Sequence, residues 1–147
     1  MRSLDWLLLF KKIDFIACLQ ILTPLIKVIM KKRILIIEDN EDIRENTAEL
    51  LTLVGYYVVT ANNGTDGVAL IAEMLPDVII CDVVMPGMNG YEVFDWLLQN
   101  HSMKKIRFIL STAQSERSHF DKAREVGIEN YLVKPFNESE LINSIER

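Results

Sequence analysis

The chain is poor in the residues that build several special classes of protein. It has two cysteines, six glycines and four prolines among 147 residues, and aromatic residues make up 8%. Two cysteines, Cys18 and Cys81, are too few for a disulfide scaffold and are typical of reduced thiols in the cytoplasm. The low glycine and proline counts exclude a collagen-like chain, and a hydrophobic content of 50% excludes a disordered one.

Positive charge is also scarce. Sixteen basic residues stand against 21 acidic ones, which gives a formal net charge of −5. Because a nucleic-acid partner requires a basic surface, we expect none for this chain. The length of 147 residues suits one domain with a substantial hydrophobic core.

The first 29 residues differ in composition from the rest. They carry four basic and two acidic residues, so residues 30–147 carry a net charge of −7. They are also rich in apolar residues, but charged residues and Pro24 interrupt the run from Ile13 to Met30 and make it a marginal membrane span. A secretory signal fits poorly, since no small-residue cleavage site follows. We therefore predict an apolar, weakly basic extension, 1–29, before a domain at 30–147.

Three interpretations of this extension stay open. Met30 is followed by three basic residues and an apolar run, the usual opening of a cytoplasmic α/β domain, so the upstream residues could be dispensable. They could instead form an amphipathic helix that lies on a membrane or a partner, or a true membrane span. Membrane contact is expected only if the extension belongs to the native protein, and we predict a cytoplasmic location.

Five short apolar runs alternate with five amphipathic stretches after residue 30. Runs of continuous apolar residues are typical of parallel strands buried on both faces, and a 3.6-residue period is typical of helices. The pattern predicts an α/β fold, a doubly wound five-stranded parallel sheet with five helices on its two faces. The predicted strands are 34–37, 57–60, 78–81, 106–110 and 131–133, and the predicted helices cover about 43–54, 68–75, 91–99, 115–126 and 138–147.

Polar residues follow four of the five predicted strands. The carboxyl ends of parallel strands meet at one edge of such a sheet, where ligands bind. Carboxylates from two neighbouring strands repel one another, and a hard cation such as Mg²⁺ relieves that repulsion by taking oxygen ligands. The residues in question are Glu38 and Asp39, then Asp82, Ser111 with Thr112, and finally Lys134.

This set suits the transfer of a phosphoryl group. Asp82 is the candidate nucleophile, because carboxylates form acyl phosphates. Thr112 supplies a hydroxyl and Lys134 a cation for the phosphoryl oxygens. The segment after Asp82 contains a Pro-Gly turn, whose backbone can approach a metal and a phosphate closely.

In these motifs the chain resembles the receiver domain of response regulators in two-component signalling. That family has an acidic pair after strand one, a phosphoacceptor Asp followed by Met-Pro-x-x-x-Gly after strand three, Ser/Thr-Ala after strand four and Lys-Pro after strand five. The intervals are typical of the family, with 43 residues from Asp39 to Asp82, 30 from Asp82 to Thr112 and 52 from Asp82 to Lys134. The resemblance covers Lys31 to Arg147 and implies a flavodoxin-like sheet with strand order 2-1-3-4-5.

The resemblance implies roles for single residues. Asp82 would accept a phosphoryl group from a phosphohistidine on a sensor histidine kinase or a phosphotransfer protein. Thr112 and Lys134 would contact the phosphoryl oxygens, and Thr112 would move inward while Tyr131 turns from exposed to buried. The implied Mg²⁺ ligands are Glu38, Asp39, Asp82 and the backbone carbonyl of Val84.

Three further positions matter in this family. The bond between Lys134 and Pro135 is expected to be cis, the isomer with which the family aims its lysine. Val84 and Gln114 occupy positions that flank the path of the water that hydrolyses the aspartyl phosphate in similar receivers. Val84 cannot orient this water, whereas Gln114 can, so we predict a phosphoryl lifetime that is not at the fast end.

Two other functions compete with the phosphoacceptor switch. A Mg²⁺-dependent phosphohydrolase of the haloacid-dehalogenase kind also uses an aspartyl phosphate, but that family has a second Asp where Val84 stands here. A degenerate receiver would be an interaction module that works without phosphorylation, although all the reactive positions are filled in this chain. We therefore predict a signalling module with self-phosphorylation and self-dephosphorylation chemistry, not an enzyme.

The output of the switch is less well defined by the sequence. Only 13 residues follow Lys134, enough for a final helix. We therefore expect a stand-alone receiver that acts by docking to a downstream protein. In the family the docking face is formed by helix four, strand five and helix five.

Overall fold

The computed structural model describes residues 17, 20, 31–100, 105–113 and 117–147. The chain divides into two units, Met1–Lys31 and Lys32–Arg147. The predicted extension lies outside the described residues except for positions 17 and 20, so its status stays a prediction. Among the residues that are described, no helix is both long and apolar enough to cross a membrane.

The second unit alternates strands and helices, as the sequence pattern predicts. Its five parallel strands lie in the order β2-β1-β3-β4-β5, and five helices connect and follow them. The strands are β1 (Arg33–Ile37), β2 (Tyr57–Ala61), β3 (Val78–Asp82), β4 (Arg107–Ala113) and β5 (Tyr131–Lys134). The helices are α2 (Glu41–Val54), α3 (Gly64–Met74), α4 (Gly90–Gln99), α5 (Arg117–Glu125) and α6 (Glu138–Glu146).

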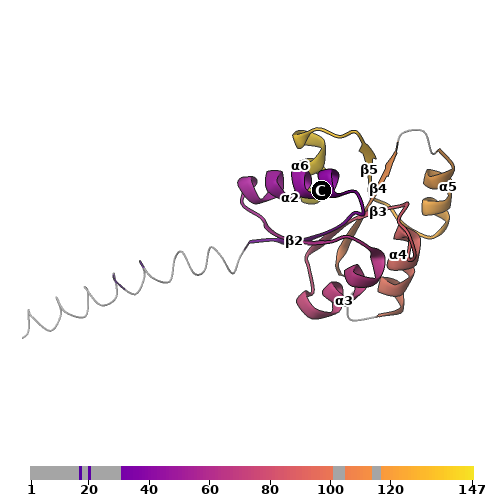
Figure 1. Ribbon diagram of the computed structural model, residues 1–147, viewed down its shortest axis with the longest axis horizontal. Coiled ribbons are helices and arrows are strands. Elements are labelled where there is room, and N and C mark those ends of the chain that lie inside the picture. Colours follow the sequence, from indigo (N-terminus) through magenta and orange to yellow (C-terminus); the bar gives the residue numbers. More distant parts are fainter. Residues whose placement is uncertain (1–16, 18–19, 21–30, 101–104, 114–116) are drawn as a thin grey trace, which may run out of the picture. The chain divides into compact units, whose positions relative to one another are not determined.

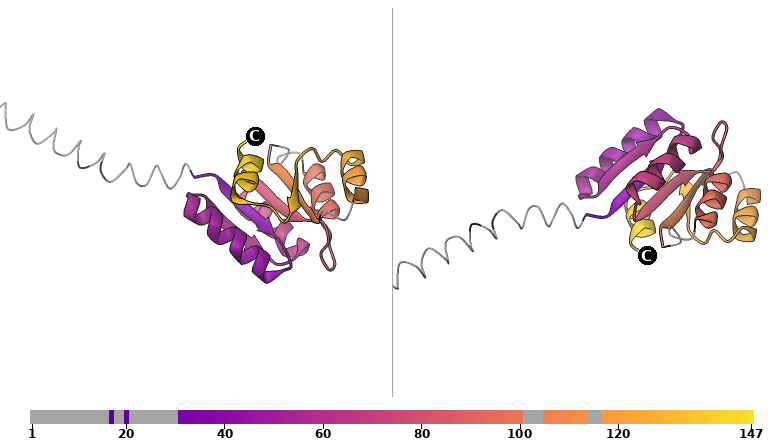
Figure 2. Two further views of the ribbon diagram at one scale, coloured as in Figure 1. Left: turned by 90° about the horizontal axis from the view of Figure 1, so that it is seen from above. Right: turned by 90° about the horizontal axis from the view of Figure 1, so that it is seen from below.

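The helices form two layers around the sheet. Helices α2 and α6 cover one face, and α3, α4 and α5 cover the other (Figures 1 and 2). Each face has its own hydrophobic cluster. Ile36, Ile80 and Ile109 pack with residues of α2 and α6, whereas Leu35 and Ile79 belong to the cluster on the other face. Because both faces are buried, the strands are apolar without interruption, as expected for a parallel sheet.

The ends of the helices follow from local sequence. Asn137 is the N-cap of α6, and it forms a capping box with Glu140. Gly55 ends α2 with φ of 111°, a left-handed conformation that favours glycine. Asn40, Asn63 and Asn89 are the N-caps of α2, α3 and α4, and their side-chain oxygens accept hydrogen bonds from the first turns.

Four strands, β2, β3, β4 and β5, run further at their carboxyl ends than the sequence pattern predicts, and β3 and β4 are the clearest cases. Asp82 is the last residue of β3 instead of the first residue after it, and β4 continues to Ala113. Cross-strand pairing explains both, since Asp82 pairs with Ser111 and Ala113 pairs with Lys134. Polarity alone does not end a strand when a neighbouring strand supplies its hydrogen bonds.

Two glycines allow α3 and α4 to lie against the carboxyl end of the sheet. A β-carbon on Gly64 would lie 2.4 Å from the carbonyl oxygen of Met88, and one on Gly90 would lie 2.4 Å from that of Asp82. Both contacts are with backbone atoms, which cannot turn aside as a side chain could. The segment between β3 and α4 is therefore held close to both helices.

Candidate functional site

The site lies at the carboxyl ends of the strands, where one lysine joins two carboxylates. The Lys134 Nζ atom lies 2.5 Å from Glu38 Oε2 and 2.6 Å from Asp82 Oδ1. Glu38 is 4% exposed and Asp82 is 8% exposed. Lys134 ends β5, whereas Asp82 ends β3, so the lysine side chain crosses β4 to reach its partners.

Three carboxylates at this edge form a group that can hold a metal ion. Ligand oxygens of Glu38, Asp39 and Asp82 all lie within 4.8 Å of one another. Glu38 and Asp82 each place a second oxygen near a backbone amide, because the N–H groups of Asn40 and Val84 donate to them at 3.3 Å and 3.0 Å. Such a set of hard oxygen donors fits Mg²⁺.

Burial and neighbouring charges shift the pKa values of Glu38 and Lys134. Burial raises the pKa of Glu38, the hydrogen bond from Lys134 opposes that shift, and the negative charge of Asp82 adds to it. Burial alone would lower the pKa of Lys134, but the hydrogen bonds to Asp82 and Glu38 outweigh it and raise the pKa. The ammonium is therefore charged at neutral pH. The cluster holds one cation against several carboxylates, which favours the binding of a further cation.

The other predicted site residues lie around this group. Thr112 is 1% exposed, and its hydroxyl donates to the carbonyl of Ala113 at 3.5 Å. Val84 is 58% exposed, beside Asp82. Gln114 lies outside the described residues. The inward movement of Thr112 and the Val84 carbonyl as a ligand stay predictions.

Tyr131 and Pro135 occupy β5 and the turn after it. The Tyr131 ring is partly buried against the cluster on the α3, α4 and α5 face, and its hydroxyl donates to the carbonyl of Ile128. Its turn from exposed to buried stays a prediction. The bond between Lys134 and Pro135 is cis, the isomer that the resemblance implies.

One residue of the site escaped the sequence analysis. The guanidinium of Arg44 donates to the carbonyl oxygens of Glu38 at 2.9 Å and Asp39 at 3.4 Å. It thereby fixes the segment that carries both acids. An arginine in the helix that directly follows an acidic pair is a weak signal, and only the fold shows that its side chain turns back towards β1.

The fold and this group of residues define a receiver of the response-regulator class. The family model described as "Response regulator receiver domain" matches residues 34–146. The chain therefore belongs to the response regulator receiver domain family. Proteins of this family generally bind Mg²⁺ through an acidic cluster and interact with histidine kinases or phosphotransfer proteins and with downstream targets.

Three relatives illustrate the similarity. Protein PilG of Pseudomonas aeruginosa is 36% identical over 116 residues, which are 78% of this chain and 84% of PilG. The polar-differentiation response regulator DivK of Brucella anthropi is 31% identical over 80% of this chain and 95% of DivK. The crystal structure of the chemotaxis protein CheY4 of Vibrio cholerae superposes with a TM-score of 0.74 at 30% identity, over 80% of this chain and 98% of CheY4.

Proposed function

We propose that this chain is a phosphoacceptor switch in a two-component phosphorelay. Asp82 accepts a phosphoryl group from a phosphohistidine on a sensor histidine kinase or a phosphotransfer protein, and the phosphorylated form binds a downstream protein. The supporting observation is the buried Asp82 carboxylate, which shares the Lys134 ammonium with Glu38. The protein is a signalling module and not a metabolic enzyme. We also infer a cytoplasmic location, which the free thiol of Cys81 supports.

Asp82, Lys134 and Thr112 have separate roles in the transfer. An oxygen of Asp82 attacks the phosphorus, the bond between phosphorus and the donor imidazole nitrogen breaks, and the imidazole leaves with the bonding electrons. Lys134 and Thr112 bind the oxygens of the phosphoryl group, which carry the negative charge, as this group moves onto Asp82. When bound to Glu38, Asp39, Asp82 and the Val84 carbonyl, Mg²⁺ supplies further positive charge for these oxygens. Hydrolysis of the acyl phosphate returns the carboxylate.

Acetyl phosphate tests this proposal without a kinase. With Mg²⁺ present, we expect intact-mass measurement to show a single phosphoryl addition, and we expect Asp82→Asn to abolish it. Asp95→Asn, on the exposed face of α4, is the matched control and should keep the addition. Absence of the addition in the unchanged chain would favour an interaction module, and rapid turnover of many phosphate esters would favour a phosphohydrolase.

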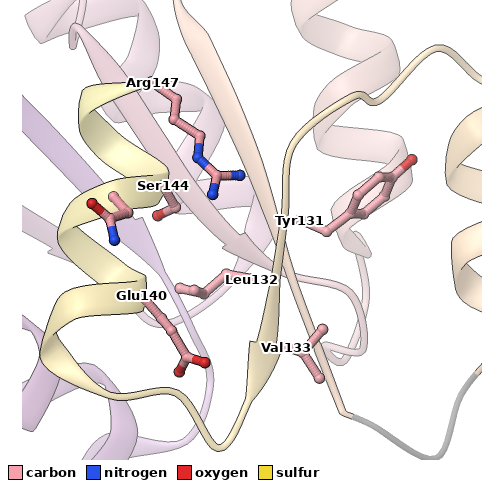
Figure 3. Close-up of a pocket in the computed structure, with 7 residues that line it drawn as sticks. Tyr131, Leu132, Val133, Glu140, Ser144 and Arg147 are labelled. Atoms are coloured by element: carbon pink, nitrogen blue, oxygen red, sulfur yellow. The ribbon is translucent and has the colours of Figure 1, made fainter.

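We infer that the downstream protein docks on the face formed by α5, β5 and α6. Support comes from a pocket between β5 and α6, to which α6 contributes Glu140, Asn143 and Ser144, and Arg147 follows directly after the helix (Figure 3). Tyr131, Leu132 and Val133 of β5 complete its lining, and the next residue of that strand is Lys134. The strand thus connects the phosphorylation site with the pocket. A target captured by the phosphorylated chain, but not by Asp82→Asn, should protect the amides of β5 and α6 from hydrogen exchange.

A further inference from the structure

The hydroxyl of Ser111 is a buried polar group whose place in the fold is not explained by packing. Ser111 is 2% exposed, and within the described part of the chain its Oγ atom has no hydrogen-bond partner. A hydroxyl in this position has lost its water without gaining a replacement, which destabilises a fold. Alanine would occupy the same place without that loss, so a function for the hydroxyl must be sought in another state of the protein.

The register of the sheet places Ser111 next to the reacting carboxylate. Ser111 pairs with Asp82 on one side and with Leu132 on the other. Residues paired in this way share a sheet face, so all three lie on the face that α2 and α6 cover. Thr112 pairs with Val133 and belongs to the alternate set of residues. The two neighbouring hydroxyls on β4 therefore lie on different faces.

The lysine of the site starts on the same face and crosses the strand that carries Ser111. Lys134 lies two residues beyond Leu132, and its Nζ atom reaches Asp82 on the far side of β4. The side chain therefore starts opposite Ala113 and ends at Asp82, the residue with which Ser111 pairs. In the structure its ammonium is engaged by one oxygen of Glu38 and one of Asp82.

Both of these carboxylates bind other groups when a cation or a phosphoryl group occupies the site. A cation draws on oxygens of Glu38 and Asp82, and phosphorylation converts one Asp82 oxygen into the bridging oxygen of an acyl phosphate. The phosphoryl oxygen that Lys134 binds takes one of the three N–H donors of the ammonium, so a further acceptor can take another. A serine hydroxyl has two lone pairs and can accept such a bond, and Ser111 holds this capacity unused in the structure.

We propose that Ser111 is a positioning residue for Lys134. Its hydroxyl accepts a hydrogen bond from the Lys134 ammonium when a divalent cation or a phosphoryl group engages Glu38 and Asp82, and it keeps the ammonium beside Asp82. The inference rests on the phosphoacceptor function proposed above. It assigns no proton transfer to Ser111, whose effect is exerted through the lysine.

Four side chains at position 111 test the proposal. Ser111→Ala removes the hydroxyl, whereas Ser111→Thr and Ser111→Val form a pair of equal shape that differ only in having a hydroxyl or a methyl group. The melting temperature of each protein would be measured alone and with Mg²⁺ and beryllium trifluoride, an analogue of the phosphoryl group. Without ligands, we expect Ser111→Ala to melt at or above the temperature of the unchanged chain.

With ligands, the order of melting temperatures should reverse, so that Ser111→Ala melts below the unchanged chain. We expect the affinity for Mg²⁺ with beryllium trifluoride to fall about tenfold from Ser to Ala and about tenfold from Thr to Val, the effect of one hydrogen bond to a charged group. Nitrogen-15 spectra of the Lys134 ammonium add a readout that packing does not change. Its protons should be protected from exchange in the loaded Ser and Thr proteins and lose that protection in the Ala and Val proteins.

The result separates this inference from the proposed function. Equal affinities within both pairs, with unchanged lysine spectra, would overturn the role of Ser111 while leaving the phosphoacceptor function intact. If the unchanged chain showed neither stabilisation by these ligands nor a phosphoryl addition from acetyl phosphate, both proposals would fail together.

Discussion

At the scale of single residues, Lys134 is the group that allows two carboxylates to be buried at the site. Its ammonium neutralises part of the charge of Glu38 and Asp82, and the two acids tolerate burial because they share it. Asp39 differs from both, since it is exposed. Binding of a cation therefore depends on Asp39 as a carboxylate that the lysine does not occupy in this structure.

The first prediction concerns this third carboxylate. We expect Asp39→Asn to weaken Mg²⁺ binding about tenfold or more, because it removes one charged ligand, while the stability of the metal-free protein changes little. The measurement is the rise in melting temperature on titration with Mg²⁺. Asp42→Asn, an exposed acid in the first turn of α2, is the control and should retain the full rise. Equal Mg²⁺ responses of the two variants would contradict the ligand set.

A second prediction at this scale concerns the lifetime of the acyl phosphate. The Val84 backbone amide donates to Asp82 at 3.0 Å, while its side chain is 58% exposed and cannot hydrogen-bond to water. We expect Val84→Asn to accelerate loss of the phosphoryl group several-fold, because an amide side chain there can orient the attacking water. The decay of the phosphorylated mass after removal of acetyl phosphate measures this rate. Val84→Ala supplies the control, and no difference between Asn and Ala would argue against a water-orienting position.

At the scale of elements, the segment between β3 and α4 depends on its neighbours for its shape. Pro86, Gly87 and Met88 follow Asp82 closely, and the start of α3 meets the carbonyl of Met88 where Gly64 leaves space. The residues from Gly64 to Gly67 form the first turn of α3. Gly67 has a packing role as well, since a β-carbon there would lie 2.5 Å from the end of the Ile37 side chain.

This packing leads to a prediction for Gly64. Gly64→Ala should destabilise the protein by about 1–3 kcal/mol, the usual cost of overpacking, because the contact is with a backbone oxygen. Urea unfolding gives the free energy, and the rate of phosphorylation by acetyl phosphate reports on the displaced segment. Thr65→Ala, at the next and exposed position of α3, should leave both quantities nearly unchanged. A Gly64→Ala protein of undiminished stability would show that the segment is free to shift.

At the scale of the second unit, three distant segments meet at the end of the sheet opposite the site. The hydroxyl of Tyr56 donates to Glu146 Oε1 at 2.6 Å, and Lys32 donates to Glu146 Oε2 at 2.7 Å. The glutamate at the end of α6 thereby joins residues at the entrances to β1 and β2. Burial and the hydrogen bond to Glu146 raise the pKa of Tyr56 from 10.0 to about 12.

This shift predicts how stability depends on pH. The folded protein favours the neutral phenol, so the contribution of Tyr56 is fully present below pH 10.0 and is lost as the pH rises towards about 12. Across this range of pH, the melting temperature should therefore fall less steeply for Tyr56→Phe than for the unchanged chain. Tyr57→Phe, at an exposed neighbouring position, should follow the unchanged chain. Parallel curves for all three proteins would contradict the raised pKa.

Local patterns in the sequence predicted much of the fold because they act over short distances. The N-cap at Asn137 and the end of α2 at Gly55, for example, depend only on backbone groups within a few residues. Helical periodicity was a poorer guide to burial at the ends of helices. Val54 and Leu75, the apolar residues that end the predicted helices 43–54 and 68–75, are 45% and 48% exposed.

The sequence by itself determined the five units of strand and helix and the positions of the polar residues at the strand ends, since both are written in local order and periodicity. Only the tertiary structure decided which of these residues meet. Lys134 is separated along the chain from Glu38 by 96 residues and from Asp82 by 52, and the register of four strands, β1, β3, β4 and β5, sets their contact. The same register places Ser111 beside Asp82. Such contacts depend on the alignment of strands across the sheet, which no local pattern encodes.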